Sequence, residues 1–428
     1  MKLSIDRPHL HIYLVFINQS FQPFSTIKNF NKMTTFKTIL AALMIAPAFT
    51  AFAGDCNPLS GEFRIGKTDA DYATVGAAVN ALKCGGISGP VTFLLEDGKY
   101  SEKIDLSTIS GVSAQNTVTF ESAKGNNSDV VLTSDNNDAA FTLGLNGSAF
   151  VSFENLTIEN KTGNTGNAVR IDGAAKNIKF KNVVFDGTDR PATGANSAVI
   201  YSTAAATKSN ITFEDCEVNN GSVGLYKGGS ASADTRTSIT GTLFFNQYES
   251  AVSLSNEVAP IISNNVISSV SNNKNYKAIS LDAVNGSLIV SNNVVNAVNG
   301  TFGLAMNNCN GDNNNYANVT NNSVNVGGES SMYGLYLSGS TDNVVFNFNR
   351  VKLTPAKQSA SNQAYYKNTG TGANINLLNN IFFDLNTGGY TILGNTYKDY
   401  FNQLPSQSNS SLSVSANGIM IEKVMPAN

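Results

Sequence analysis

Residues 260–267 read PIISNNVI, and this phrase returns four more times along the chain. The later copies are LIVSNNVV at 288–295, ANVTNNSV at 317–324, VVFNFNRV at 344–351 and INLLNNIF at 375–382, so the period is 27 to 31 residues. With the first residue of each copy as position i, apolar or small residues recur at i, i+2 and i+7, and asparagine recurs at i+5. The i and i+2 pair is typical of a half-buried strand, whereas the step from i+2 to i+5 shifts the alternation and predicts a corner.

The same frame continues toward the N-terminus without the asparagine. Repeats start at 151, 178, 211 and 237, and weaker ones start at 91 and 118. A third short strand precedes most starts, as in AVRID, AVSLS, AISLD, FGLAM and YGLYL. Three strands per repeat with unequal loops predict an all-β solenoid, a single-stranded parallel β-helix of about eleven coils over residues 91–384.

The repeated asparagine predicts an internal ladder. Stacked at one corner of successive coils, asparagine side chains can hydrogen-bond along the stack, and asparagine tolerates the left-handed backbone of a sharp corner. In the alternative interpretation, each NN pair marks an exposed turn of a separate hairpin. Five copies in one register favour the ladder. Its expected members are Asn265, Asn293, Asn322, Asn349 and Asn380.

The N-terminal 53 residues are expected to lie outside the fold. Residues 33–53 have a basic start at Lys37, an apolar core and an Ala51-Phe52-Ala53 cleavage site, which predicts a signal peptide and a secreted or cell-surface protein. Residues 1–32 are then either an upstream extension from a misassigned start or a genuine N-terminal extension.

Composition narrows the classes of partner. Residues 1–53 hold five of the 28 Lys and Arg residues, one of the 31 Asp and Glu residues and both histidines, so the remainder carries a net charge near −7. Without a basic run we expect no nucleic-acid partner. Without histidine or a CxxC motif we expect no metal site and no cofactor. No later apolar run is long enough for a transmembrane segment.

An N-terminal cap is expected over residues 54–90. It contains an amphipathic helix at 74–83, with Thr74 as the N-cap and two glycines at the end. Cys56 and Cys84 flank this helix and are the best candidates for a disulfide in an oxidising compartment. Cys216 falls on an inward position, and Cys309 lies in a polar loop and could be free. Residues 385–428 form either a C-terminal cap or a truncated tail.

The helix phrase YATVGAAVNAL, the segment GPVTFLLEDGKYSEKI and the coils with NN corners resemble the pectin lyase-like superfamily of right-handed parallel β-helix proteins. Within it, DGKYSEKI resembles the early G-x-Y-x-E segment of pectin methylesterases. The whole opening also resembles secreted surface proteins of Bacteroidetes-type bacteria. The resemblance implies the right-handed fold over about residues 69–384 and a site on the outer face of the stacked strands.

That outer face offers few ionisable groups. Arg170, Asp172 and Asp282 are the only candidates for catalysis, and the register places Asp282 about four layers, or roughly 19 Å, from the other two. A pectate lyase would need a Ca²⁺ cluster and a nearby base, and hydrolases and methylesterases of the superfamily need carboxylate sets that this face lacks. Ca²⁺ is therefore expected only if the protein is a lyase.

Tyrosine and lysine side chains are the remaining candidates for a ligand site. Tyr226, Tyr336 and Lys367 lie in strands of this outer face, and tyrosine rings can stack on sugars while their hydroxyls donate hydrogen bonds. We therefore expect a non-enzymatic scaffold that binds a polysaccharide or another surface polymer. The alternative is a polysaccharide lyase or a pectin-esterase-like enzyme.

Overall fold

The computed structural model describes residues 56–134, 140–161, 166–189, 193–203, 209–228, 236–313, 315–329, 331–356, 362–369, 374–384, 390–393 and 419–421. The expected signal peptide at 33–53 and the extension before it lie outside these residues. Among them, no helix has the length and apolar character needed to cross a bilayer.

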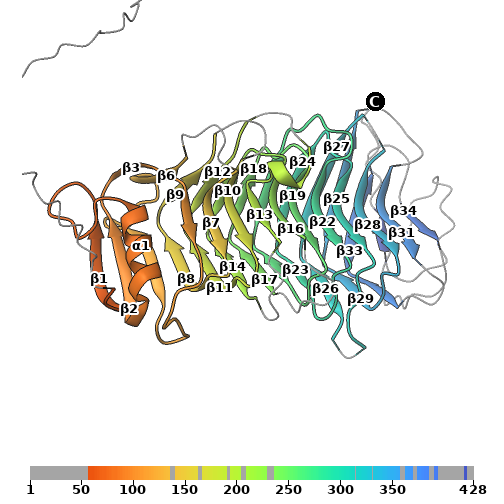
Figure 1. Cartoon of the computed structure of the whole chain (residues 1–428). Coiled ribbons are helices and arrows are strands. Elements are labelled where there is room, and N and C mark those ends of the chain that lie inside the picture. Colours follow the sequence, from red (N-terminus) through yellow and green to blue (C-terminus); the bar gives the residue numbers. More distant parts are fainter. Residues whose placement is uncertain are drawn as a thin grey trace, which may run out of the picture. The chain divides into compact units, whose positions relative to one another are not determined.

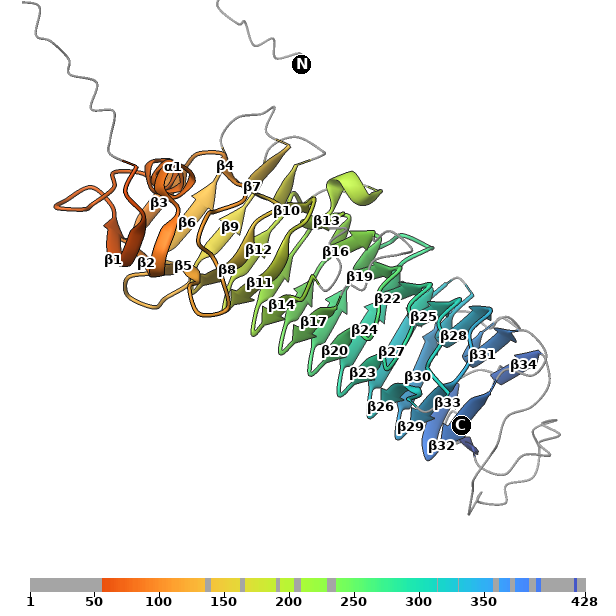
Figure 2. The same cartoon turned by 60° about the horizontal axis from the view of Figure 1, so that its bottom comes forward.

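Three parallel sheets run the length of a right-handed β-helix of about eleven coils (Figures 1 and 2). Each coil contributes one strand to each sheet, and every pairing between neighbouring coils is parallel. This is the parallel β-helix that the repeat predicts.

Sheet A contains β1 (Leu59–Ile65), β2 (Ile87–Leu95), β5 (Val118–Ser122), β8 (Ala149–Glu154), β11 (Lys176–Lys181), β14 (Ile211–Glu214), β17 (Thr237–Thr240), β20 (Ile261–Ser263), β23 (Ile289–Ser291), β26 (Ala317–Thr320), β29 (Val344–Asn347) and β32 (Ile375–Leu378). Sheet B contains β3 (Gly98–Ser101), β6 (Val130–Thr133), β9 (Thr157–Glu159), β12 (Val184–Asp186), β15 (Glu217–Asn219), β18 (Leu243–Phe245), β21 (Val266–Ser269), β24 (Val294–Val298), β27 (Ser323–Gly328), β30 (Arg350–Pro355), β33 (Asn380–Asp384) and β35 (Ile419–Ile421). Sheet C contains β4 (Ile104–Leu106), β7 (Phe141–Asn146), β10 (Asn167–Asp172), β13 (Ile200–Ser202), β16 (Val223–Gly228), β19 (Ser250–Ser255), β22 (Lys277–Asp282), β25 (Phe302–Asn307), β28 (Tyr333–Gly339), β31 (Gln363–Thr369) and β34 (Tyr390–Leu393).

The sequence frame matches the inside of the coil. Positions i, i+2, i+5 and i+7 are buried in all nine repeats that start between residues 151 and 375. The first pair lies on or one residue before a strand of sheet A, and the second pair lies on or just before a strand of sheet B. The corner between these sheets has a left-handed residue at i+4, which is one of Asn155, Asn182, Asp215, Gly241, Asn264, Asn292, Asn321, Phe348 and Asn379. The attribution of left-handed backbone to the asparagine at i+5 is therefore wrong, and the residue before it adopts that conformation.

The asparagine ladder is confirmed. Each side-chain amide from Asn265 to Asn349 donates to Oδ1 of the next ladder asparagine at 2.9–3.0 Å. The backbone N–H of the same residue donates to that same oxygen at 2.9–3.0 Å. The second amide hydrogen donates to a carbonyl of the preceding coil at 2.8–2.9 Å. The side chains are at most 3% exposed, so these bonds satisfy polar groups that water cannot reach.

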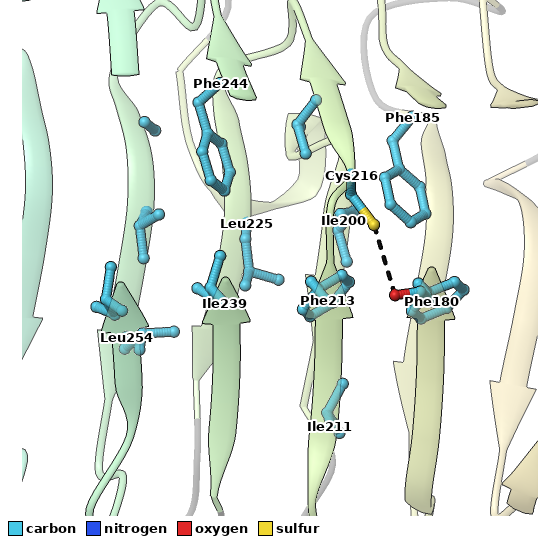
Figure 3. Close-up of a cluster of buried hydrophobic side chains, with 14 of the residues drawn as sticks. Phe180, Phe185, Ile200, Ile211, Phe213, Cys216, Leu225, Ile239, Phe244 and Leu254 are labelled. Atoms are coloured by element: carbon cyan, nitrogen blue, oxygen red, sulfur yellow. Dashed lines mark hydrogen bonds between the residues drawn. The ribbon is translucent and has the colours of Figure 1, made fainter. Parts of the chain in front are cut away.

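The first coils fill the same interior with aromatic rings. Five phenylalanines at i+2 stack along sheet A with ring centroids 4.8–5.5 Å apart: Phe93, Phe120, Phe153, Phe180 and Phe213. Figure 3 shows the end of this stack, where Phe185 packs edge-on against Phe180 and aliphatic side chains follow in the next coils. All five rings are buried.

The N-terminal end of the solenoid is covered by one helix, α1 (Val75–Gly85), close to the predicted 74–83. Thr74 is its N-cap and accepts a hydrogen bond from the backbone N–H of Ala77, and Glu102 accepts from the N–H groups of the first two helical residues. Cys56 and Cys84 form a disulfide with their Cα atoms 5.1 Å apart. Closing this loop contributes about 3–4 kcal/mol in the chain-entropy model.

The boundaries of the solenoid differ from the expected ones. Strand β1 already belongs to sheet A, so the expected cap at 54–90 contains the first strand of the helix. Beyond residue 384, β34 extends sheet C and β35 extends sheet B. Cys309 is free, as the sequence left open, and its side chain is buried in the core.

Candidate functional site

The outer face of sheet C carries one row of side chains in register across eight strands. From β10 to β31 the row reads Arg170, Tyr201, Tyr226, Ser253, Ser280, Ala305, Tyr336 and Tyr366. Two tyrosines thus stand on each side of three small residues, and Arg170 ends the row at β10. Because parallel strands are about 4.8 Å apart, the row leaves a gap of roughly 19 Å between Tyr226 and Tyr336.

The wall toward the N-terminus is a pair of stacked tyrosines. The rings of Tyr201 and Tyr226 lie 5.5 Å apart and nearly parallel, and the Arg170 guanidinium lies 4.9 Å from the Tyr201 ring centroid. The Nε atom of Arg170 also donates to the Asp172 carboxylate at 2.6 Å. These contacts hold Tyr226 in place from one side and leave the ring face toward the gap uncovered.

The opposite wall is a cluster of four aromatic rings. Tyr336 stacks on Tyr366 at 5.1 Å, and Phe302 stacks on Tyr333 at 5.2 Å, while edge-on contacts join the two pairs. Burial, with smaller effects of Tyr366 and Tyr336, raises the pKa of Tyr333, so its hydroxyl stays protonated at neutral pH. Such a rigid wall offers ring faces and hydroxyl groups together.

The gap between the walls is a trough of about 800 Å³. Ser253, Ser280 and Ala305 form its floor, and among the residues that the structure describes Lys277 and Asp282 are the only acidic or basic ones that line it. A second polar row runs along one edge, in which Ser338 donates to Asn307 at 2.9 Å and Asn307 donates to Asp282 at 2.7 Å. The described part of the trough lining therefore consists mainly of hydroxyls, amides and rings, with one amine and one carboxylate.

The structure separates the three predicted catalytic residues. Asp282 lines the trough, whereas Arg170 and Asp172 lie on β10, four strands away, and form an ion pair with each other. Thr203 donates a further hydrogen bond to Asp172. The two β10 residues thus satisfy each other and support the Tyr201 wall, and they do not share a site with Asp282.

Of the predicted ligand-binding residues, Tyr226 and Tyr336 line the trough and Lys367 does not. Lys367 is buried on the inner side of β31, and burial lowers its pKa. Its assignment to a surface ligand site is therefore wrong. The physical reason is the register: Tyr336 pairs with Tyr366, so the neighbours Tyr365 and Lys367 both face inward.

Four residues in and behind the aromatic wall were not predicted. Lys277 and Phe302 line the trough, and Tyr333 and Tyr366 pack against Tyr336. The signal for them was available, because aligning KAISLD, FGLAMN, YGLYLSG and QAYYKNT on their inward residues places these rings on one face. Lys227, like Lys367, faces the interior of the coil. Its amine forms an ion pair with Glu257 at 3.0 Å, and both side chains are buried.

The side chains in the trough do not fit a Ca²⁺ site. Ca²⁺ takes six to eight oxygen ligands, usually with several carboxylates, and the lining residues that the structure describes include only Asp282 among acidic groups. Across the described parts of the chain, no three His, Cys, Asp or Glu side chains are grouped so that they could hold a metal ion.

No family model and no curated protein matches this chain. Among solved structures, it is similar to a GH136 lacto-N-biosidase from Eubacterium ramulus, with 12% identity over 78% of this chain and 67% of that one, at a TM-score of 0.46. It is also similar to PfbA, a surface adhesin of Streptococcus pneumoniae, with 14% identity over 76% of this chain and 92% of that one, at a TM-score of 0.43. At these values we take no activity or ligand from either protein.

Proposed function

We propose that this protein is a secreted or cell-surface scaffold that binds a polysaccharide, or another hydroxyl-rich surface polymer, without cleaving it. The observation that carries the proposal is the trough itself, with aromatic walls at both ends and a floor of small residues. Sugar rings present apolar CH faces and polar edges, which suit tyrosine rings and the serine and asparagine side chains along the trough.

The charge of the trough favours binding over chemistry. General acid–base catalysis needs a proton acceptor and a donor with matched pKa values within hydrogen-bond reach of the reacting atoms. Asp282 lies at the polar edge and already accepts a hydrogen bond from Asn307 at 2.7 Å. Asp282 is the single carboxylate among the described residues that line the trough, whereas a glycosidase uses a pair of carboxyl groups.

A lyase or esterase remains the second candidate because Lys277 and Asp282 line the same trough. An amine and a carboxylate could serve as base and acid if a substrate lay between them. This alternative predicts products, namely unsaturated sugars, new reducing ends or released methanol.

The test measures retention of the full chain on immobilised polysaccharides, together with a search for those products. Tyr336→Ala should weaken retention on a bound polysaccharide about tenfold, which corresponds to about 1.4 kcal/mol, with little change in melting temperature. The matched control is Phe348→Ala, which removes a ring that is 59% exposed and does not line the trough.

Equal loss in both variants would show that retention does not depend on the trough and would overturn the binding proposal. Product release that Asp282→Asn abolishes would replace it with the enzymatic alternative. Retention that survives Asp282→Asn but not Tyr336→Ala is the expected result.

A further inference from the structure

A strip of exposed apolar side chains lies on sheet B, on a different face from the trough. Val266 on β21 pairs in register with Leu243 on β18 and with Val294 on β24, so three apolar residues stand side by side across neighbouring coils. These three are 38–49% exposed. Further exposed members of this apolar strip are Phe245, Val270 and Val298, at 38–63% exposure.

The apolar strip is unusual for its sheet. The equivalent outward positions on the neighbouring strands are polar: Glu217 pairs with Leu243 on one side, and Ser323 pairs with Val294 on the other. Exposed apolar side chains that stand side by side in successive strands, as Leu243, Val266 and Val294 do, often mark an interaction surface.

Opposite charges bound the apolar strip along the helix axis. On the N-terminal side lies Glu217 of β15, whose carboxylate accepts a hydrogen bond from Asn219 at 2.7 Å. On the C-terminal side, Arg350 and Lys352 of β30 are both exposed and follow Ser323 and Asn325 in register. Along the outer face of sheet B, an acidic residue on β15 is therefore followed by the apolar strip and then by two basic residues on β30. These six strands span roughly 24 Å.

We propose that the apolar strip binds a second copy of this chain, face to face, with the two helices antiparallel. A two-fold axis that lies in the plane of the interface, at right angles to the solenoid axis, brings the two faces together and reverses the order of the strands in the partner. The acidic end of one copy then lies over the basic end of the other at both edges, and the apolar residues meet in the middle. A parallel arrangement would instead place Glu217 against Glu217 and Arg350 against Arg350, which like-charge repulsion disfavours.

The proposed interface is distinct from the trough, so it survives if the trough binds nothing. A face about 24 Å long lies at the small end of stable protein interfaces, and the association is expected to depend on concentration. Sedimentation of the full chain over a range of concentrations should show a reversible monomer–dimer equilibrium.

The first variants test the apolar centre. Val266→Asp, and separately Val294→Asp, should lower the association constant at least tenfold because each places a charge in the apolar contact. The control is Ile261→Asp, which changes an equally exposed apolar residue, 37% exposed, on the outer face of sheet A. A chain that stays monomeric at every concentration, or a dimer that Ile261→Asp breaks as strongly, overturns the proposal.

The second variants test the antiparallel order by exchanging charges. Glu217→Lys should weaken self-association about tenfold, and so should the double variant Arg350→Glu with Lys352→Glu, because each copy then faces like charge. Mixing the two variants should restore association to within about threefold of the original protein, because both edges of the mixed dimer are again complementary. Self-association that Glu217→Lys strengthens, or a mixture that does not recover, overturns the antiparallel pairing, and a trimer or larger assembly overturns the two-fold.

Discussion

The early and late coils share one backbone path but fill its first corner differently. In the coils that start at 151, 178 and 211, position i+5 is Leu156, Val183 or Cys216, and phenylalanines stack beside it at i+2. In the coils that start from 260 onward, position i+5 is asparagine and the residue at i+2 is mostly aliphatic. The corner therefore requires a buried side chain at i+5, and this side chain can be either apolar or a hydrogen-bonded amide.

The two solutions differ in how they depend on their neighbours. An apolar corner residue is stable next to any other apolar residue, so Leu156 and Val183 need no match. A buried asparagine is stable only when both amide hydrogens and the oxygen are satisfied, and the next asparagine supplies that partner. This dependence explains why the five asparagines form one uninterrupted run instead of being scattered among the coils.

The boundary between the regions is gradual. Cys216 lies 3.5 Å from the carbonyl oxygen of Phe180, which is the position that a ladder amide takes in later coils (Figure 3). Thr242, in the next coil, donates its backbone N–H to Oδ1 of Asn265 at 2.8 Å. The ladder thus begins with backbone contacts one coil before its first asparagine.

The largest expected effect is in the early coils. Phe180→Ala removes a ring that stacks on Phe153 and Phe213, and a cavity in a close-packed stack should cost about 3–5 kcal/mol of unfolding free energy. The two free thiols report which region opens, because burial raises the pKa of Cys216 and of Cys309 to about 12 and keeps both unreactive in the folded state.

In Phe180→Ala, thiol labelling at pH 8 should accelerate at Cys216 more than at Cys309, since coils contact mainly their neighbours. Phe348→Ala, which changes an exposed ring, is the control. Equal acceleration at both thiols would mean that the early and late coils open as one unit, which would contradict the expectation that the two regions have separate stabilities.

The second effect is in the ladder. Asn322→Leu leaves the amide of Asn293, the carbonyl of Val290 and one acceptor site of Asn349 without their partner, and unsatisfied buried groups of this kind cost about 1–3 kcal/mol. Denaturant melts should show this loss, and thiol labelling should now accelerate at Cys309.

The control for the ladder is Asn321→Gly, which changes the exposed neighbouring residue at a corner where φ is +55° and glycine is tolerated. A neutral Asn322→Leu, with Asn321→Gly also neutral, would show that the ladder selects the register of the coils without stabilising them.

The sequence predicted the inside of this fold well and its outside only in part. Strict spacing at i, i+2, i+5 and i+7 forces one buried set, because slipping by one residue would bury the polar partners instead. Outward residues face no such constraint. Tyrosine occurs on both the buried and the exposed side of strands, so the composition of QAYYKNT does not show which of its two tyrosines faces the core. In the structure Tyr365 is buried between Phe346 and Phe382, and Tyr366 is on the surface.

The trough and the apolar strip are properties of several coils at once. Each tyrosine of the trough walls looks ordinary in its own repeat, and the site exists only when strands 25 to 31 residues apart are aligned in register. The same holds for the exposed apolar residues at i+6, which are Leu243, Val266 and Val294. Only their occurrence in three successive coils distinguishes them from isolated surface side chains. Periodicity within one repeat therefore predicts the core, and the functional faces need the register between repeats.

The smallest expected effect is an extension of the ladder toward the early coils by Thr242→Asn. In this variant the new oxygen would face the backbone N–H of Cys216, and the new amide would face the Phe213 carbonyl and Oδ1 of Asn265, which already accepts the N–H of residue 242. One added rung should raise the unfolding free energy by about 1 kcal/mol, measured as a shift of the denaturant midpoint at unchanged slope. Val183→Asn is the matched control, because its neighbours Leu156 and Cys216 offer no amide partner and the variant should be destabilised. Thr242→Asn as unstable as Val183→Asn would show that packing against Phe213, rather than the lack of an asparagine partner, ends the ladder at this coil.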